Sequence, residues 1–224
     1  MREQRDPTGR LPYRLWYEES EIDAIMEDEF QKAGAPVLPG TIAVDIDAFI
    51  EGYLGVVPDF VALPDGVQGA TEFYPDGRVR VKMSEDLALR ADGSPGAERL
   101  LRTTLAHEAS HVLLHRALFL RGTEPLFGGA ASRQELCRDV GFLAPGYTGE
   151  WWEWQANRGM AALLLPRTRL IAEIQRRRTA SPNDSVGDVI KHLAVGFAVS
   201  RQAVRYRLEQ LGIVADPRQQ ALDL

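Results

Sequence analysis

The amino-acid sequence predicts an α+β fold, in which helices pack with a small antiparallel sheet and a helical segment follows at the C-terminus. Apolar residues recur with a helical period on both sides of a central stretch, residues 57–83, where the period changes to that of β-strands. Short turn signals divide this stretch into three runs. The 224 residues are enough for one sizeable core, or for a domain of about 150 residues with a small appendage.

The N-terminal part is predicted to be a short irregular segment followed by two helices. Residues 1–16 contain turn-forming prolines and glycine and are predicted to be irregular. Ser20 can cap a helix that ends at Gly34. The apolar residues of this helix fall on one face: Ile22, Ile25, Met26 and Phe30. A second short helix is predicted over residues 45–54.

Three short runs of β-type composition form the predicted sheet: 57–63, 69–74 and 78–83. Pro-Asp-Gly sequences at 64–66 and 75–77 separate the runs, and both are turn signals. Residues alternate strictly over 78–83, as in a half-buried strand. An exposed edge strand can pair with an extended peptide, and residues 69–71 are the predicted edge.

A long helix is predicted from residue 97, because apolar residues continue at helical spacing. Residues 121–149 hold six glycines and two prolines and are predicted to be an irregular loop that could shape or cover a cleft. A further helix is predicted over 151–165, ended by Pro166. The predicted organisation is therefore an irregular tail, one domain and a helical C-terminal segment, over 1–16, 17–166 and 167–224.

Composition excludes several classes of protein. No apolar run approaches the roughly 20 residues needed to cross a bilayer, and residues 1–10 lack the apolar stretch of a secretory signal. Cys137 is the only cysteine, which excludes an internal disulfide and a Cys-rich zinc site. A cytoplasmic protein without membrane contact is expected.

Charge is distributed unevenly along the chain. The net charge is −6, which argues against a surface coated with nucleic acid. Residues 166–224 hold 10 Lys+Arg and 6 Asp+Glu, or +4, and the remainder holds 16 and 26, or −10. A mildly basic end on an acidic body indicates two functional parts, although a solvated surface without an electrostatic role explains it equally well.

The five residues from His107 to His111 have the HExxH pattern of zinc hydrolases. Histidines four residues apart on a helix project from the same face, so both imidazoles can reach one ion. Catalytic zinc commonly takes three protein ligands and a water molecule, whose pKa it lowers to about 7. Glu108 can take a proton from that water and deliver it to the leaving amine. The alternative is a pair of helix histidines without a metal.

A third ligand has to come from another segment. Glu150 and Glu153 lie among three tryptophans, where a buried carboxylate requires a cation. Attraction to a helix N-terminus explains Glu150 well but Glu153, about one turn further on, less well. Cys137 is a weak candidate. His115 follows His107 by eight residues, after a rotation of about 80°, so it is expected to pack beside the ligands rather than bind the metal.

Two segments resemble the ImmA/IrrE family of bacterial metallopeptidases. Residues 104–115 carry the HExxH helix, and residues 153–166 begin E-x-x-A-N and end L-L-x-P. The resemblance implies a zincin-like domain in which Glu153 is the third zinc ligand and Asn157 lies beside the site. The family usually has glycine where this chain has Ser110, and the stretch between the two motifs is longer here.

The resemblance also implies a function. Family members are typically cytoplasmic, and some cleave a helix-turn-helix repressor. A regulatory zinc endopeptidase is therefore expected, acting on a protein substrate such as a DNA-binding repressor by metal-activated attack of water. No oxyanion-stabilising donor is evident, and Tyr147 is an unsupported candidate. The second hypothesis is a DNA-binding regulator or toxin–antitoxin component whose zinc domain is a sensor.

Residues 185–212 have the pattern of a helix-turn-helix. Ser200 is a favourable helix N-cap, and Gly212 is a favourable residue just after the helix end. The second helix would present four side chains to nucleic acid or protein: Arg201, Gln202, Arg205 and Tyr206. The family often carries a similar segment within its own architecture. Because the segment is only mildly basic, a helical hairpin packed on the domain is favoured over direct DNA contact.

Overall fold

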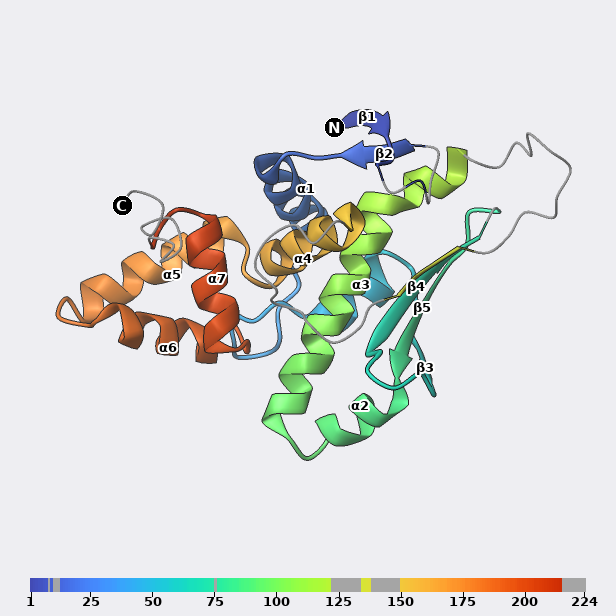
Figure 1. Cartoon of the computed structure of the whole chain (residues 1–224). Coiled ribbons are helices and arrows are strands. Elements are labelled where there is room, and N and C mark those ends of the chain that lie inside the picture. The colour runs from blue at the N-terminus through green and yellow to red at the C-terminus, as the bar shows by residue number, and fades with distance from the viewer. Residues whose placement is uncertain (8, 10–12, 75, 122–133, 138–149, 215–224) are drawn as a thin grey trace, which may run out of the picture.

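The computed structural model describes residues 1–224 except 8, 10–12, 75, 122–133, 138–149 and 215–224. The described residues form the predicted α+β fold, with helices packed beside a small sheet and a second, two-stranded sheet near the N-terminus (Figure 1). None of the helices in this described part has both the length and the apolar character needed to span a membrane.

The N-terminal segment contains a β-hairpin, so the prediction of an irregular segment over 1–16 is wrong. β1, Arg2–Arg5, pairs antiparallel with β2, Tyr13–Trp16. Pro7 and Gly9, two of the residues that suggested irregularity, lie between the strands, and Gly9 has a φ of 72°. Glycine adopts this left-handed conformation readily, so the turn signal marks a hairpin. Trp16 stacks on Trp154 with ring centroids 5.3 Å apart, which holds the hairpin on the body.

The two helices predicted next are present with small changes. α1, Glu19–Lys32, starts from a capping box of Glu18 and Glu21 instead of from Ser20. Its buried residues lie on the predicted apolar face: Ile22, Met26 and Phe30. The second is the short π-helix η1, Ala48–Tyr53, where a longer helix was predicted.

Four strands form the larger sheet in the order β3-β5-β4-β6. Their bounds are Asp59–Val61, Gly69–Phe73, Val79–Ser84 and Gln134–Cys137 for β3, β4, β5 and β6. β4 is antiparallel to β5 and β6, whereas β3 runs parallel to β5. The prediction that 69–71 form an exposed edge is wrong, because β6 pairs with β4 on that side. β6 comes from the 121–149 stretch, whose glycine-rich composition concealed a strand.

α3, Pro95–Arg121, and α4, Trp151–Leu164, are the predicted helices that carry the two motifs. A short helix that no pattern revealed, α2, Glu85–Ala91, precedes α3 and is capped by Ser84. The C-terminal helices are α5, Arg167–Ala180, α6, Val186–Gly196, and α7, Arg201–Gln210. The division of the chain into domains stays a prediction.

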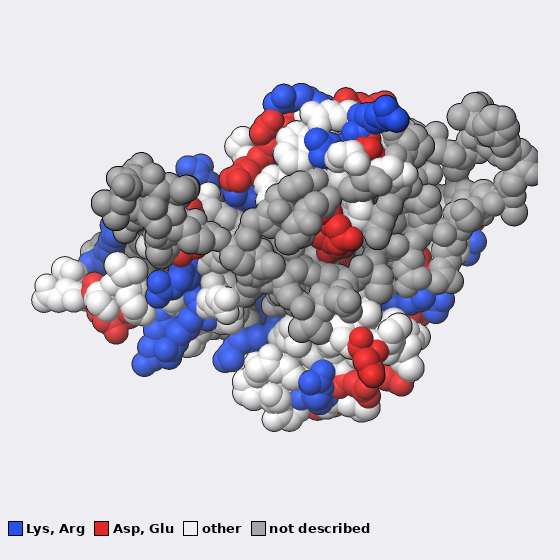
Figure 2. Space-filling view, viewed as in Figure 1, with Lys and Arg blue, Asp and Glu red and all other residues white. Residues whose placement is uncertain are grey.

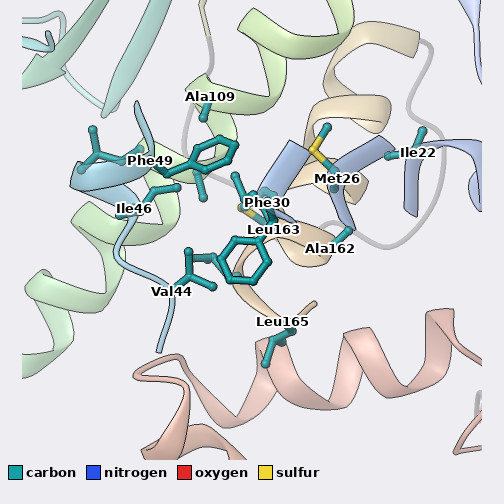
Figure 3. Packing of buried hydrophobic residues seen from close by; sticks show 14 of the residues in the cluster. Ile22, Met26, Phe30, Val44, Ile46, Phe49, Ala109, Ala162, Leu163 and Leu165 are labelled. Atoms are coloured by element: carbon teal, nitrogen blue, oxygen red, sulfur yellow. The ribbon is translucent and has the colours of Figure 1, made fainter. Parts of the chain in front are cut away.

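The main core lies where α1, α3 and α4 meet (Figure 3). Buried apolar side chains from these helices and from the segment leading into η1 converge there: Ile22, Met26, Phe30, Val44, Ile46, Phe49, Ala109, Ala162 and Leu163. Interiors of this kind are close-packed and resist displacement of their helices. The core therefore holds α4 against α3 and brings the two sequence motifs together.

Candidate metal centre

The two motif helices approach each other closely. His107 and His111 lie one turn apart on α3, and Glu153 lies in the first turn of α4. At the crossing, Ser110 of α3 meets Gly159 of α4, and a Cβ atom on Gly159 would lie 2.8 Å from Ser110 Oγ. Serine at position 110 is therefore accommodated because α4 has no side chain opposite it.

Three side chains of the types that bind metal ions converge in the interior. His107 Nε2 lies 3.0 Å from His111 Nε2 and 3.1 Å from Glu153 Oε2. His111 Nε2 lies 3.4 Å from Glu153 Oε1, and all three residues are buried. Ligand atoms about 2.0–2.1 Å from a tetrahedral zinc ion lie about 3.3 Å from one another. The spacing of this group and its two imidazoles and one carboxylate therefore fit zinc.

The protonation states of the buried groups are consistent with a cation site. Burial raises the pKa of the Glu153 carboxyl, but His111 and His107 outweigh burial and hold that pKa well below its usual value. Glu153 is therefore a carboxylate, the form that binds a metal ion. Burial, assisted by the neighbouring His111, lowers the pKa of His115 to about 3. His115 is therefore neutral near physiological pH.

Glu108 is buried and lies against β4. Thr71 Oγ1 donates a hydrogen bond of 2.6 Å to Glu108 Oε2. A Cβ atom on Gly69 would lie 2.7 Å from Glu108 Oε1, so a residue with a side chain would displace the carboxylate. Neither contact was evident from the sequence, since Thr71 lies in a distant strand and belongs to no motif.

His115 lies beside His111, with the two Nδ1 atoms 3.0 Å apart. On its other side, His115 Nε2 lies 3.0 Å from Gln155 Oε1 of α4. Gln155 is fully buried and was missed by the sequence prediction. The signal that could have revealed it is a glutamine within a tryptophan-rich helix, because a buried amide requires hydrogen-bond partners.

The other predicted neighbours of the site are more dispersed. Glu150 is the N-cap of α4 and is not part of the group of three ligating residues that the described part of the chain brings together. Asn157 is half-buried one turn after Glu153, and its role beside the site stays a prediction. Tyr147, the side chain of Cys137 and most of the loop predicted to shape the cleft lie outside the described residues.

α6 and α7 are consecutive helices joined by a short connection, and their identity as a helix-turn-helix motif stays a prediction. The Ser200 hydroxyl caps α7 by accepting a hydrogen bond from Ala203 N, and Gly212 has a positive φ of 65° just after the helix. Three predicted contact residues are exposed: Arg201, Gln202 and Arg205. Tyr206 is half-buried and lines an apolar cavity of about 210 Å³ between α3, α4 and α7. Figure 2 shows Lys and Arg side chains gathered over this end of the molecule.

α7 is also anchored to the body of the protein. Arg207 is buried, and its guanidinium contacts Asp23 of α1 at 2.8 Å and the Leu165 carbonyl at 3.3 Å. Val204 and Leu208 are buried on the same face. Within the part of the chain that the structure describes, Arg201, Gln202 and Arg205 of α7 remain exposed for a partner.

Comparison with known proteins adds to this geometry. The family model described as Peptidase M78, IrrE N-terminal-like domain, matches residues 144–209. The matched range contains Glu153, the helices α4 to α6 and α7 up to residue 209, whereas the HExxH residues on α3 precede it. A search of curated proteins gave no match. The family match confirms the resemblance to the ImmA/IrrE metallopeptidases that the sequence predicts.

Proposed function

We propose that this protein is a zinc-dependent endopeptidase that cleaves a protein substrate. The observation that carries the proposal is the buried group of His107, His111 and Glu153, whose ligand atoms all lie within 4.8 Å of one another. Two imidazole nitrogens and a carboxylate oxygen held this close together in the interior are suited to sharing one cation. The family match supports a peptidase, and peptidases of this type act on proteins.

The residues around the group have distinct roles in the proposed reaction. His107, His111 and Glu153 would hold zinc, which when bound activates water and polarises the scissile carbonyl. Glu108 accepts the proton of the attacking water and delivers it to the leaving amine. Thr71 holds one carboxylate oxygen of Glu108 by a 2.6 Å hydrogen bond, which fixes the direction in which the carboxylate faces.

The proposed substrate is a DNA-binding repressor of the helix-turn-helix type, and the proposed location is the cytoplasm. The family resemblance supports both. The single cysteine of the chain is also consistent with a reducing compartment.

The proposal is tested by comparing the wild type with Glu108→Gln. Both proteins should contain close to one zinc per chain after purification without chelators, because Glu108 is not in the ligand group. Only the wild type should cleave a candidate repressor whose gene neighbours the gene of this protein. Mass spectrometry of the products measures the cleavage. Wild-type protein that lacks zinc, or a Glu108→Gln variant that cleaves at the wild-type rate, would contradict the proposal.

A second candidate function is DNA binding or a toxin–antitoxin role, with zinc as a sensor. The observation in its favour is the exposed row of Arg201, Gln202 and Arg205 on a helix capped by Ser200. The anchoring of α7 through Arg207 favours the structural role instead. Fluorescence anisotropy with duplex DNA separates them: DNA binding predicts an affinity that falls with salt and is lost in an Arg201→Glu/Arg205→Glu variant that still binds zinc.

A further inference from the structure

A continuous row of hydrogen bonds runs from the N-terminal hairpin to a metal-ligating histidine. Gln155 Nε2 donates to the Leu15 carbonyl of β2 at 2.9 Å. Gln155 Oε1 lies 3.0 Å from His115 Nε2, and His115 Nδ1 lies 3.0 Å from His111 Nδ1. The side chains of Gln155, His115 and His111 are all at most 1% exposed. Because water does not reach this row, each group can donate to or accept from only its neighbours in the protein.

The direction of every bond in the row follows from its first member. A backbone carbonyl can only accept, so the Gln155 amide must direct its NH2 group at Leu15 and its oxygen at His115. The Gln155 oxygen can in turn only accept, so His115 carries its proton on Nε2. His115 is fully buried and its Nε2 faces a neutral amide, and the 3.0 Å gap between its Nδ1 and His111 Nδ1 has room for one proton. With the His115 ring proton already on Nε2, its Nδ1 offers a lone pair that accepts the Nδ1 proton of His111. His111 is thereby left with a lone pair on Nε2, the atom that faces His107 and Glu153.

The opposite arrangement of protons is unfavourable at two places. With the proton of His111 on Nε2, the lone pairs of His111 Nδ1 and His115 Nδ1 would face each other at 3.0 Å in the interior. The Nε2 atom of His111 would also be unable to bind a cation. Reversing the row would require the Gln155 oxygen to face the Leu15 carbonyl oxygen at about the present contact distance, which is repulsive.

We propose that Gln155 is a positioning residue that, through His115, keeps the proton of His111 on Nδ1 and so prepares His111 Nε2 to bind the metal ion. This inference rests on the proposed zinc site. In this proposal His115 accepts a hydrogen bond from Nδ1 of His111. A residue that only filled space in the core would not need to accept that bond. Partners of ligating histidines generally fix the ring orientation and tautomer in this way.

The N-terminal hairpin is part of the same arrangement. The Leu15 carbonyl belongs to β2, and Trp16 of β2 stacks on Trp154, the neighbour of Gln155. Tyr17 donates a hydrogen bond of 3.3 Å to the Leu114 carbonyl of α3, beside His115. These contacts fix the position of the Leu15 carbonyl relative to both motif helices.

The first experiment compares two replacements of His115 by zinc affinity, measured in competition with a chromophoric chelator. His115→Asn can place its side-chain oxygen near the position of His115 Nδ1 and accept from His111, whereas His115→Leu fills the cavity with apolar volume but offers no acceptor. We expect Leu to weaken zinc binding by about 10- to 100-fold and Asn to retain affinity within a few-fold of the wild type. A packing role for His115 predicts the reverse order, and that order would overturn the proposal.

The second experiment is Gln155→Met, a replacement of similar length that lacks the amide. It removes the group that sets the direction of the hydrogen bonds in the row. Zinc affinity should fall by about 10- to 100-fold. Met160→Leu, a volume-conserving change at another buried position of α4, is the matched control and should leave affinity unchanged. A Gln155→Met variant that binds zinc as tightly as the wild type would refute the inference.

A third readout is independent of both zinc affinity and proteolysis. Long-range ¹H–¹⁵N spectra resolve the two ring nitrogens of each of the four histidines in the chain. In metal-free protein His115 should carry its proton on Nε2, and in zinc-loaded protein His111 should carry its proton on Nδ1. His115 protonated on Nδ1 would overturn the proposal even in protein that never binds zinc. Failure of the proposed peptidase function is seen separately, as zinc-loaded wild type that cleaves no repressor.

Discussion

Replacing Gly159 by alanine tests whether the close crossing of α3 and α4 holds the proposed metal centre together. The new Cβ would lie 2.8 Å from Ser110 Oγ, 2.9 Å from Ser110 Cβ and 2.9 Å from Met26 Cε. Met26 can move its flexible end, but Ser110 is held by its own helix and by a hydrogen bond to the Ala106 carbonyl. The clash with Ser110 therefore has to separate the two helices.

The size of the effect follows from two opposing contributions. Overpacking a core costs about 1–3 kcal/mol, while alanine is about 1 kcal/mol more favourable than glycine inside a helix. Gly159→Ala should therefore destabilise the protein by between about 0 and 2 kcal/mol. In a Ser110→Gly background the clash with Ser110 is absent, and the same change should stabilise by up to about 1 kcal/mol. The two changes should thus be coupled by about 1–3 kcal/mol.

Urea unfolding of the wild type, both single variants and the double variant measures this coupling. Gly187→Ala in α6 is the control, because its Cβ would make only an ordinary contact, 3.6 Å from Ser185 Oγ. That change should be additive with Ser110→Gly. The explanation is refuted if Gly159→Ala and Ser110→Gly are themselves additive within about 0.5 kcal/mol. Zinc affinity of the Gly159→Ala variant should also fall, since Ser110 directly precedes the proposed ligand His111.

Three further outcomes are expected. Thr71→Val should lower turnover by roughly 10- to 100-fold at unchanged zinc content, because Glu108 loses its orienting bond, and Thr71→Ser should restore it; equal rates for Val and Ser would contradict this. Stripping the metal with a chelator should lower the unfolding free energy by about 4 kcal/mol relative to zinc at 1,000 times its dissociation constant, visible as a drop in Tm; an unchanged Tm would argue against a bound ion. Arg176, with help from His192 and against the effect of burial, holds the pKa of Glu173 below its usual 4.5. Because the folded-state pKa is depressed, the stability advantage of wild type over Glu173→Gln should be complete above 4.5 and disappear as pH falls through the lowered pKa; Tm measured against pH for both proteins decides this.

The parts of the structure that the sequence predicts well depend on local pattern. The spacing of His107 and His111 is a property of one helix, and the period of apolar residues placed α3 and α4 with nearly their observed bounds. Capping at Ser200 and the turn at Gly212 were likewise predictable, because both depend on neighbouring residues. The position of Glu153 beside the two histidines came from a family resemblance, since no local rule brings α4 to α3.

The parts that the sequence did not predict depend on contacts between distant segments. Thr71 reaches Glu108 only because β4 lies along α3, and Gln155 reaches His115 only because α4 crosses α3. The 69–71 edge was mispredicted because β6 is contributed by a segment more than 60 residues further along the chain. In the N-terminal hairpin the turn signals predict irregular structure instead, because neither four-residue strand has enough residues to show a period.

The Leu15 carbonyl also bears on the order in which the protein can fold and bind the proposed metal ion. Leu15 is synthesised long before α4, yet the Gln155 amide acquires its direction only when β2 and α4 are both in place. A chain that had formed α3 alone would display the two histidines with their protons free to exchange between ring nitrogens. Tight zinc uptake during refolding would therefore coincide with docking of the hairpin. The rate of zinc uptake would then report the rate at which the fold is completed.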